Sequence, residues 1–170
     1  MAIKKWVLDP AHTQIEFKVK HMMISTVTGS FSEYDGNVET EGEDFMKAKV
    51  DFSVVVASLT TGNAERDAHL KGPDFFDVAK FPISTFVITK VAPADSGRVN
   101  VSGNLTIKGE TRNITFPAKI ELDENTLKGK ANFDIDRTQW KMNYGNDKTL
   151  GDKFISETVN IELDIEAKRL

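Results

Sequence analysis

The sequence contains no cysteine among its 170 residues. This absence excludes disulfides, zinc–thiolate sites, thiol nucleophiles and iron–sulfur clusters. No run of apolar residues approaches the roughly 18 that a transmembrane helix requires, and Asp9 arrives before the apolar core of a signal peptide could form. We therefore expect no membrane-spanning helix and no signal peptide. The expected location is cytoplasmic, or periplasmic or secreted if a leader has been removed.

An excess of basic residues is also absent, because 22 basic residues face 26 acidic ones and the net charge is −4. This balance gives no electrostatic footprint for nucleic-acid binding. The sequence lacks a G-x-S-x-G elbow, a P-loop, a G-x-G-x-x-G turn and an H-E-x-x-H helix. Its three histidines, His12, His21 and His69, show no tight zinc-ligand spacing. We expect no enzyme, no metal and no cofactor.

Apolar and polar residues alternate along most of the chain, which is the pattern of strands buried on one face and wet on the other. Such strands are normally antiparallel. The apolar positions are Ile15, Phe17, Val19 and His21; Ala48 to Val56; Val99 to Ile107; Ile114 to Leu122; Leu127 to Ile135; and Val159 to Ile165. A partial strand is also expected at Trp6 to Leu8. The pattern predicts an all-β protein.

Hairpin turns are indicated where charged or glycine-containing segments separate two alternating runs. Residues 12–58 then hold three strands, residues 83–136 about four, and the last run supplies an eighth. One stretch, Asn63 to Lys71, is predicted to form a helix capped by Thr61 or Asn63. Residues 137–153 are predicted to form a long polar loop. At 170 residues the chain fits one domain, folded as an eight-stranded barrel or sandwich.

Small residues interrupt the apolar faces of several predicted strands. They are Ala48, Gly103, Ala118, Gly129 and Ala131. A solid core would need volume at these positions, because voids cost roughly 24 cal/mol per Å³. One interpretation is a lumen left partly open for an apolar ligand, since an eight-stranded barrel can hold one small molecule. The alternative is that they fit only taper, twist or bulges, with Gly103 marking a bend.

Several motifs resemble those of the YceI-like polyisoprenoid-binding family, in the same order and over nearly the whole chain. They are Trp6-x-Leu8-Asp9-x-x-His12-Thr13 with Ile15 to His21; Gly29-Ser30-Phe31 and Gly36; Thr61-Gly62-x-x-x-Arg66-Asp67-x-His69-Leu70; Asp74-Phe75-Phe76-Asp77 with Phe81-Pro82 and Phe86; Gly103 to Gly109; and Ile135-Asp136-Arg137. Two positions depart from the family pattern. Thr13 replaces the usual serine, and Lys141 stands where glycine usually follows the aromatic residue.

The resemblance implies an extended, lipocalin-like, eight-stranded antiparallel β-barrel with a short helical segment at one end. It also implies a lumen that takes up a long-chain isoprenoid or fatty-acyl lipid, and a homodimer. Burial contributes about 0.8 kcal/mol per CH₂, whereas association and ordering consume about 4–15 kcal/mol. A useful complex therefore needs a tail well beyond about ten carbons.

The apolar candidates for ligand contact come from the inward faces of the strands and from the aromatic motif segments. They are Phe17, Val19, Phe31, Phe52, Val54, Phe75, Phe76, Phe86, Ile107, Phe116 and Phe133. We expect about half of the strand residues among them to touch ligand and the others to form core. This expectation follows from pockets being mostly apolar with few polar groups.

The polar candidates are Arg66, His69 and His21. Arg66 and His69 lie three residues apart on the predicted helix and share a face, where they could meet an anionic or quinone head group. The alternative, which we favour, is that Arg66 pairs with a carboxylate such as Asp67 or Asp77. His21 continues the inward phase of its strand, and it is the only polar side chain expected in the lumen. The alternative is that His21 is simply hydrogen-bonded at the end of its strand. Arg137 is expected to cap the barrel or to bind.

Three functions remain open from the sequence. The first is a carrier or store for a long isoprenoid or acyl chain, which predicts an apolar tunnel. The second is an enzyme acting on an isoprenoid lipid in the same barrel, which predicts a buried acid or base with altered titration. The third is a filled barrel or sandwich that serves as a protein-interaction module, which predicts no cavity. The carrier is the function we expect.

Overall fold

The computed structural model describes residues 2–21, 25–147 and 154–170, and these ranges form ten strand segments, one α-helix and four short 3₁₀ turns. The strands are β1 (Ile3–Leu8), β2 (Gln14–His21), β3 (Ser25–Phe31), β4 (Tyr34–Glu41), β5 (Asp44–Val55), β6 (Ile83–Pro93), β7 (Val99–Ile107), β8 (Glu110–Leu122), β9 (Thr126–Asp136) and β10 (Ile155–Arg169). The helix is α1 (Ala64–Lys71), and the turns are η1 (Pro10–His12), η2 (Val56–Ser58), η3 (Asp95–Gly97) and η4 (Arg137–Trp140). No helix in these ranges is long and apolar enough to cross a membrane.

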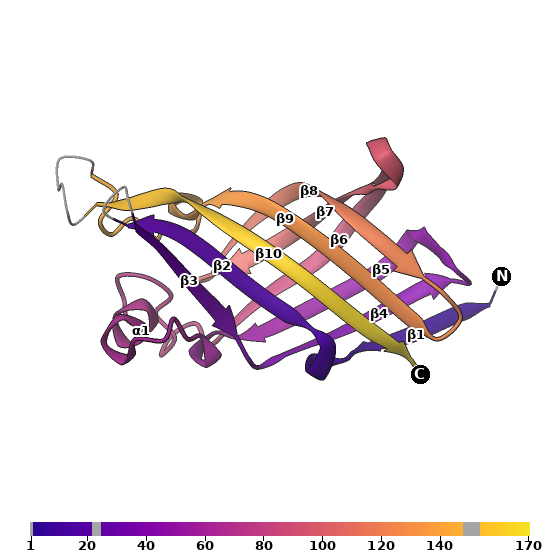
Figure 1. The fold of residues 1–170 in the computed structure, drawn as a ribbon, viewed down its shortest axis with the longest axis horizontal. Helices are drawn as coiled ribbons and strands as arrows, with labels where there is room; N and C mark the ends of the chain where they lie inside the picture. Colours follow the sequence, from indigo (N-terminus) through magenta and orange to yellow (C-terminus); the bar gives the residue numbers. More distant parts are fainter. Residues whose placement is uncertain (1, 22–24, 148–153) are drawn as a thin grey trace.

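The strands form one closed antiparallel barrel, elongated along the strand direction (Figure 1). β1 and β2 act as one strand interrupted by η1, and β3 and β4 as a second, so the ten segments make eight barrel strands. From β4 onward each strand pairs with the next along the chain. The last strand, β10, pairs with both β1 and β2 and thereby closes the barrel. The predicted eight-stranded antiparallel barrel is confirmed.

The interruption at η1 follows from its sequence, because Pro10 cannot donate a ladder hydrogen bond. The Asp9 carboxylate accepts a hydrogen bond from the Ala11 N–H and so caps the turn. Thr13 then returns the chain to the sheet: its hydroxyl donates to the Asp9 carbonyl at 2.8 Å and accepts from the Glu166 N–H at 3.1 Å. The threonine that departs from the family pattern therefore supplies the hydroxyl that this position uses. The partial strand expected at Trp6 to Leu8 is β1.

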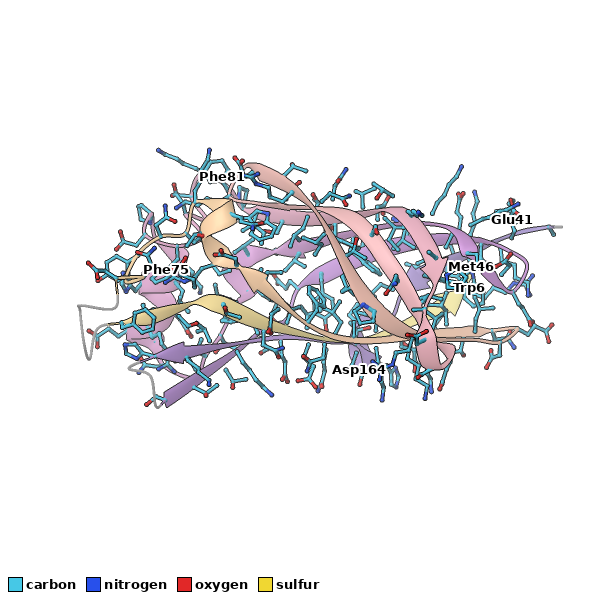
Figure 2. All side chains as sticks on the ribbon, turned by 90° about the horizontal axis from the view of Figure 1, so that it is seen from above. Trp6, Glu41, Met46, Phe75, Phe81 and Asp164 are labelled. Carbon is cyan, nitrogen blue, oxygen red and sulfur yellow. The ribbon has the colours of Figure 1, made fainter. Side chains whose placement is uncertain are left out.

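Both chain termini lie at one end of the barrel (Figure 1), where Trp6 (Figure 2) belongs to a cluster of buried residues. Trp6 is completely buried there, and its indole N–H donates to the Thr40 hydroxyl at 3.0 Å. Trp6 packs with Val38, Val50 and Ala48. Ala48 belongs to this cluster and is not among the residues that line the cavity described below, so the interpretation of Ala48 as lumen space is wrong.

The opposite end carries α1 (Figure 1). β8 and β9 are paired only where Ala118 to Leu122 meets Leu127 to Ala131, toward the Trp6 end, so the wall between them needs a cover toward the α1 end. η4 supplies one cover, since the Trp140 indole N–H donates to the Leu105 carbonyl at 3.0 Å. The free edge of β3 is covered separately by the segment leading into α1, through reciprocal backbone hydrogen bonds of Ser30 and Thr60.

The helix forms where the sequence predicts it. Asn63 is the cap, because its side chain accepts a hydrogen bond from the Arg66 N–H at 3.0 Å. The Asp67 carboxylate receives both the N–H and the hydroxyl of Thr61, which ties the first turn back to the linker. These hydrogen bonds, led by the one from the Thr61 hydroxyl, lower the pKa of Asp67.

Phenylalanine rings lie directly over three strand glycines. A Cβ atom on Gly103 would stand 2.4 Å from Phe86 Cζ, and Gly29 and Gly36 are covered in the same way by Phe17 and Phe52. Gly103 therefore accommodates the Phe86 ring and adds no open volume, so the interpretation of it as lumen space is wrong. Ala118, Gly129 and Ala131 do border the cavity described below.

The segment after β9 contains more core than the predicted polar loop. Arg137, Trp140 and Met142 are all buried, and Trp140 and Met142 pack against Ile107 and Ile135. Residues 148–153 of the predicted loop lie outside the described residues. The tryptophan and the methionine are buried because η4 covers the gap between β8 and β9.

Lys141 ends η4 in the left-handed backbone conformation, with φ 63° and ψ 20°. A non-glycine residue there costs about 1–2 kcal/mol, which explains why the family pattern has glycine at this position. Lys141→Gly is expected to raise the free energy of unfolding by about 0.5–1 kcal/mol, after its larger unfolded-state entropy is subtracted. Urea denaturation measures this change. Lys141→Ala keeps the strain and loses the ion pair with Glu110, so a gain in that variant would contradict the explanation.

Candidate functional site

A cavity of about 790 Å³ runs through the barrel. Its size lies in the upper part of the range for small-molecule sites, about 300–1,000 Å³. Every residue that the sequence placed in the binding site lines this cavity: Phe17, Val19, His21, Phe31, Phe52, Val54, Arg66, His69, Phe75, Phe76, Phe86, Ile107, Phe116 and Phe133. The structure places all of them around one cavity. Their contact with a ligand stays a prediction.

Aromatic rings form a continuous part of the cavity wall. Phe116 and Phe133 are stacked with centroids 4.1 Å apart and planes 8° from parallel, and Phe86 lies 5.7 Å from Phe116. A second group joins Phe17 of β2 and Phe31 of β3 to Phe76, which lies in the turn after α1, with centroid distances of 5.6 and 6.1 Å. Such rings present large apolar faces with little rotational freedom. They suit a long hydrocarbon chain better than a compact polar molecule.

The polarity of the lining changes along the barrel. Near Trp6 the lining is aliphatic, with Leu8, Val38, Val50, Leu127 and Ile165. Near α1 it includes Asn63, Glu65, Arg66, His69 and Arg137. In Figure 2, Trp6 marks the aliphatic end and Phe75 marks the polar end, and the two residues lie at opposite ends of the molecule. The cavity therefore has an apolar closed end and a polar end beneath the helix.

Arg66 contacts a threonine rather than an acid. Its Nε donates to the Thr61 hydroxyl at 2.8 Å and its Nη2 to the Thr61 carbonyl at 3.1 Å. Among the described residues no ion pair of Arg66 is formed, so the predicted pairing with Asp67 or Asp77 is wrong. Asp67 already accepts two hydrogen bonds from Thr61. Arg66 therefore has the structural role that we favoured, but it holds the helix through Thr61 and not through a carboxylate. Arg66 also borders the cavity.

His69 lies at the outer rim of the polar end, where its side chain is 44% exposed. Its Nε2 is 2.9 Å from the Asp74 carboxylate. The ring also packs edge-on against Phe75 and Tyr144, at centroid distances of 5.1 and 4.8 Å. These contacts connect α1 to two neighbouring turns and hold the imidazole beside the opening.

Arg137 is a buried cation that joins three parts of the polar end. It donates hydrogen bonds to the carbonyls of Met142 (2.6 Å), Ser156 (2.8 Å) and Ile155 (2.9 Å), and its guanidinium lies over the Phe75 ring at 5.9 Å. Burial lowers the pKa of Arg137, partly opposed by Glu157 and Asp136. Arg137 was expected either to cap the barrel or to bind ligand. These hydrogen bonds to the backbone fit the role of a cap.

Polar residues that the sequence analysis did not place in the site also line the cavity, among them Tyr34, Glu65 and Ser84. The expectation that His21 is the only polar side chain there is therefore wrong. Ser84 shares the inward phase of Phe86 and Ile88, so continuing that alternation by one step would have found it. Tyr34 follows a bend between β3 and β4, and its hydroxyl donates to the Thr13 carbonyl. Burial raises the pKa of Tyr34.

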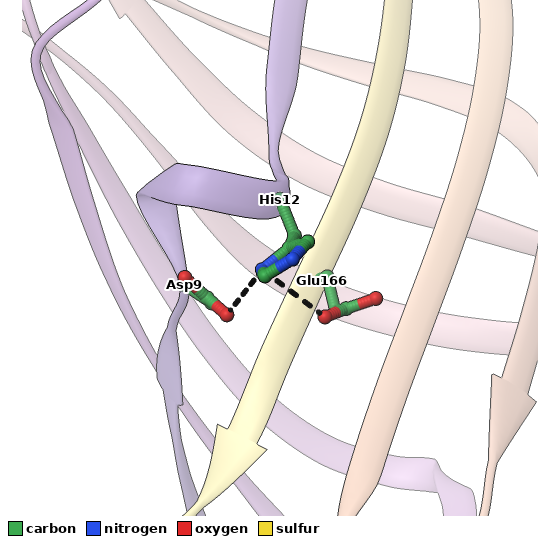
Figure 3. Close-up of side chains that lie close together, drawn as sticks. All are labelled: Asp9, His12 and Glu166. Atoms are coloured by element: carbon green, nitrogen blue, oxygen red, sulfur yellow. Dashed lines mark hydrogen bonds and ion pairs between the residues drawn. The ribbon is translucent and has the colours of Figure 1, made fainter.

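A separate cluster joins η1 to β10 at Asp9, His12 and Glu166 (Figure 3). His12 Nδ1 lies 2.8 Å from Asp9 Oδ2 and 3.7 Å from Glu166 Oε2. Among the described residues this is the one group of three possible metal ligands, and it holds one histidine. Lys168 Nζ is already 2.9 Å from Glu166 Oε2. A lysine therefore supplies positive charge at this position, and the cluster acts as a clamp between the two elements.

The clamp makes stability depend on pH. The hydrogen bond from His12 lowers the pKa of Asp9, and the one from Lys168 lowers that of Glu166. The ionised carboxylates therefore stabilise the fold above their ordinary pKa, about 4, and this contribution is lost as the pH falls through their lower folded values. Asp9→Asn is expected to reduce the melting temperature near pH 7 and to match the wild type near pH 2. Thermal melts across this range check it; a constant difference would contradict it.

The profile of the YceI-like domain matches residues 6–167. The chain belongs to the YceI-like family. A UPF0312 protein of Staphylococcus aureus (strain USA300) is 32% identical over 168 residues, covering 95% of both chains. A UPF0312 protein of Shewanella denitrificans is 37% identical over 115 residues, which covers 66% of this YceI-like chain and 60% of that one. The resemblance stated from the sequence motifs is confirmed.

Solved structures share the barrel. BcnA of Burkholderia cenocepacia superposes with a TM-score of 0.82 at 24% identity, covering 94% of this chain and 98% of that one. A polyisoprenoid binding domain from Saccharophagus degradans, implicated in plant cell wall breakdown, gives 0.78 at 18% identity, covering 96% and 97%. A YceI protein of Campylobacter jejuni gives 0.73 at 30% identity, covering 95% of each chain. These likenesses extend over 94–96% of the chain.

Proposed function

We propose that this YceI-like protein binds one long-chain isoprenoid, or a related acyl lipid, non-covalently inside its barrel. The observation that carries the proposal is the cavity of about 790 Å³ with an aromatic and aliphatic wall and one closed end. The structural neighbour described as a polyisoprenoid binding domain supports the same ligand class. A filled interaction module would have no such cavity.

The dimensions suit an extended chain. β10 has 15 residues, which span about 46 Å at the usual strand rise of about 3.3 Å. With a typical barrel tilt of about 40°, the wall is about 35 Å long. A 20-carbon tail buried in this space gains about 16 kcal/mol before the cost of association, about 4–15 kcal/mol, is subtracted. Long tails are therefore favoured over short ones.

We propose binding without chemical conversion. Three polar groups at the helix end are engaged with the protein: Arg66 with Thr61, His69 with Asp74, and Arg137 with three backbone carbonyls. An arrangement of this kind holds the mouth in place but supplies no nucleophile–base pair. Because the barrel surrounds a bound tail, the function that fits binding is carriage or storage. Homodimerisation and cytoplasmic location stay predictions, and light scattering checks the former.

The experiment is organic extraction of the purified protein followed by mass spectrometry of the extract. The proposal predicts a lipid of defined chain length near one equivalent per chain. If the extract is empty, the delipidated protein is offered geranylgeraniol, a 20-carbon isoprenoid alcohol, and saturable uptake is expected. A clean extract together with no uptake would contradict lipid binding.

A further inference from the structure

Ser84 carries an orphaned hydroxyl inside the cavity wall. Its Oγ is buried and has no hydrogen-bond partner, and no other buried side-chain nitrogen or oxygen in the described residues shares this condition. Ser84 lies near the start of β6 and lines the cavity together with Phe86 and Ile88 of the same strand face. Its cross-strand neighbour is Val54, which offers no side-chain acceptor. The position needs a partner that the barrel itself does not provide.

A buried hydroxyl without a partner is costly, so proteins rarely keep one without a use. Ser84 lines the cavity, but its Oγ is shielded even from the cavity space, so an occupant can provide the missing oxygen or hydroxyl once the Ser84 side chain turns about its Cα–Cβ bond. A single water is a weaker explanation, because an ordered buried water needs two to four polar partners. Val54, Phe86 and Ile88 give it none from their side chains.

The surroundings also restrict the charge of the occupant's head group. The cationic side chains at this end already donate to protein groups: Arg66 to Thr61, and Arg137 to the carbonyls of Met142, Ile155 and Ser156. Glu65 adds an acidic side chain to the lining. Ser84 itself lies among Val54, Phe86 and Ile88, so a carboxylate or a diphosphate at its level would be desolvated with one hydroxyl to meet it, which is unfavourable. A neutral oxygen needs only the single hydrogen bond that Ser84 offers.

We propose that Ser84 is a specificity-determining residue that binds the neutral oxygen of the ligand's head group, a hydroxyl or a carbonyl. The inference rests on the proposed lipid-binding function and deepens it. The head lies beneath α1 at the level of Ser84, and the tail extends toward the aliphatic end near Trp6. Arg66 and His69, which the sequence suggested as contacts for the head, hold the rim in place around it.

The test compares three 20-carbon ligands on the full-length protein: geranylgeraniol, the hydrocarbon phytane, and ionised geranylgeranoic acid at pH 8. Affinities are measured by competition with a fluorescent fatty alcohol. Wild type is expected to bind the alcohol about tenfold more tightly than the other two. Ser84→Ala is expected to lose this preference while binding phytane as well as wild type does. Ser102→Ala is the matched control, because Ser102 hydroxyl contacts Thr115 on the next strand and does not line the cavity.

A second readout is independent of ligand. Removing an unpaired buried hydroxyl is expected to raise the melting temperature of delipidated Ser84→Ala by about 2–4 °C, so the variant gains stability as it loses selectivity. Equal binding of alcohol and phytane by wild type, or an unchanged preference in Ser84→Ala, would overturn the role of Ser84 while leaving lipid binding intact. An unchanged melting temperature would show that water already satisfies the hydroxyl and would also overturn it. Failure of wild type to bind any of the three ligands would instead contradict the proposed function.

Discussion

Replacing Arg137 with methionine is expected to lower the free energy of unfolding by about 3 kcal/mol or more. The side chain is 3% exposed and donates to three backbone carbonyls from three separate positions. Each buried acceptor left without its donor costs about 1–3 kcal/mol. Methionine keeps much of the length of the side chain but offers no donor. Urea denaturation followed by circular dichroism measures the loss.

The control for this prediction is Arg112→Met, because Arg112 is half-exposed and its Nε makes one longer hydrogen bond, 3.3 Å, to the Gln139 carbonyl. That variant is expected to lose less than about 1 kcal/mol. Arg137→Lys is expected to fall between the two, since an ammonium group cannot reach three divergent carbonyls. A loss in Arg137→Met no larger than in Arg112→Met would contradict the role of Arg137 as the cap of the polar end.

Filling the lumen at Ala131 is expected to separate binding from stability. Ala131 lines the cavity opposite its small cross-strand partner Ala118. A leucine there occupies the space of about three methylene groups of ligand, worth about 2.4 kcal/mol or a fiftyfold loss of affinity. The delipidated variant is expected to be as stable as wild type or more stable, because the new side chain fills empty volume.

Lys119→Leu is the matched control for this substitution. Lys119 lies next to Ala118 on β8, is exposed, and pairs with Glu121 on the surface. Lys119→Leu adds a leucine on the outer surface of the barrel, so lipid uptake by this variant is expected to stay at the wild-type level. Uptake of geranylgeraniol and thermal melts are measured on both variants. Equal uptake by Ala131→Leu and wild type would show that the ligand does not occupy this part of the cavity.

Much of the fold could be predicted because alternation is a local property. A strand wet on one face shows its inward residues directly in the sequence, which is how Phe17, Phe116 and Phe133 were placed in one lumen. The helix was equally accessible, since Asn63 is a strong cap and Gly72 with Pro73 follows the last turn. The fourteen predicted site residues share the cavity for this reason.

The features that sequence reasoning missed depend on contacts between distant segments. Trp140 and Met142 are buried because β8 and β9 diverge and η4 covers the gap, and no local pattern reports that divergence. Arg66 was expected to form an ion pair with a carboxylate because it is positively charged. In the structure it donates to the Thr61 hydroxyl instead, and Asp67 accepts its hydrogen bond from Thr61. Ser84 was not predicted because only apolar residues were counted on the inward face. Its position in the alternation, two residues before Phe86, nevertheless places it on that face.

The central claim is that the barrel holds one long lipid tail. It is tested most directly by native mass spectrometry of the delipidated protein with increasing geranylgeraniol. The account predicts one adduct per chain, saturating at a single equivalent, and a strongly reduced adduct in Ala131→Leu. No adduct at any concentration, or a series of adducts that never saturates and is unchanged in Ala131→Leu, would contradict it.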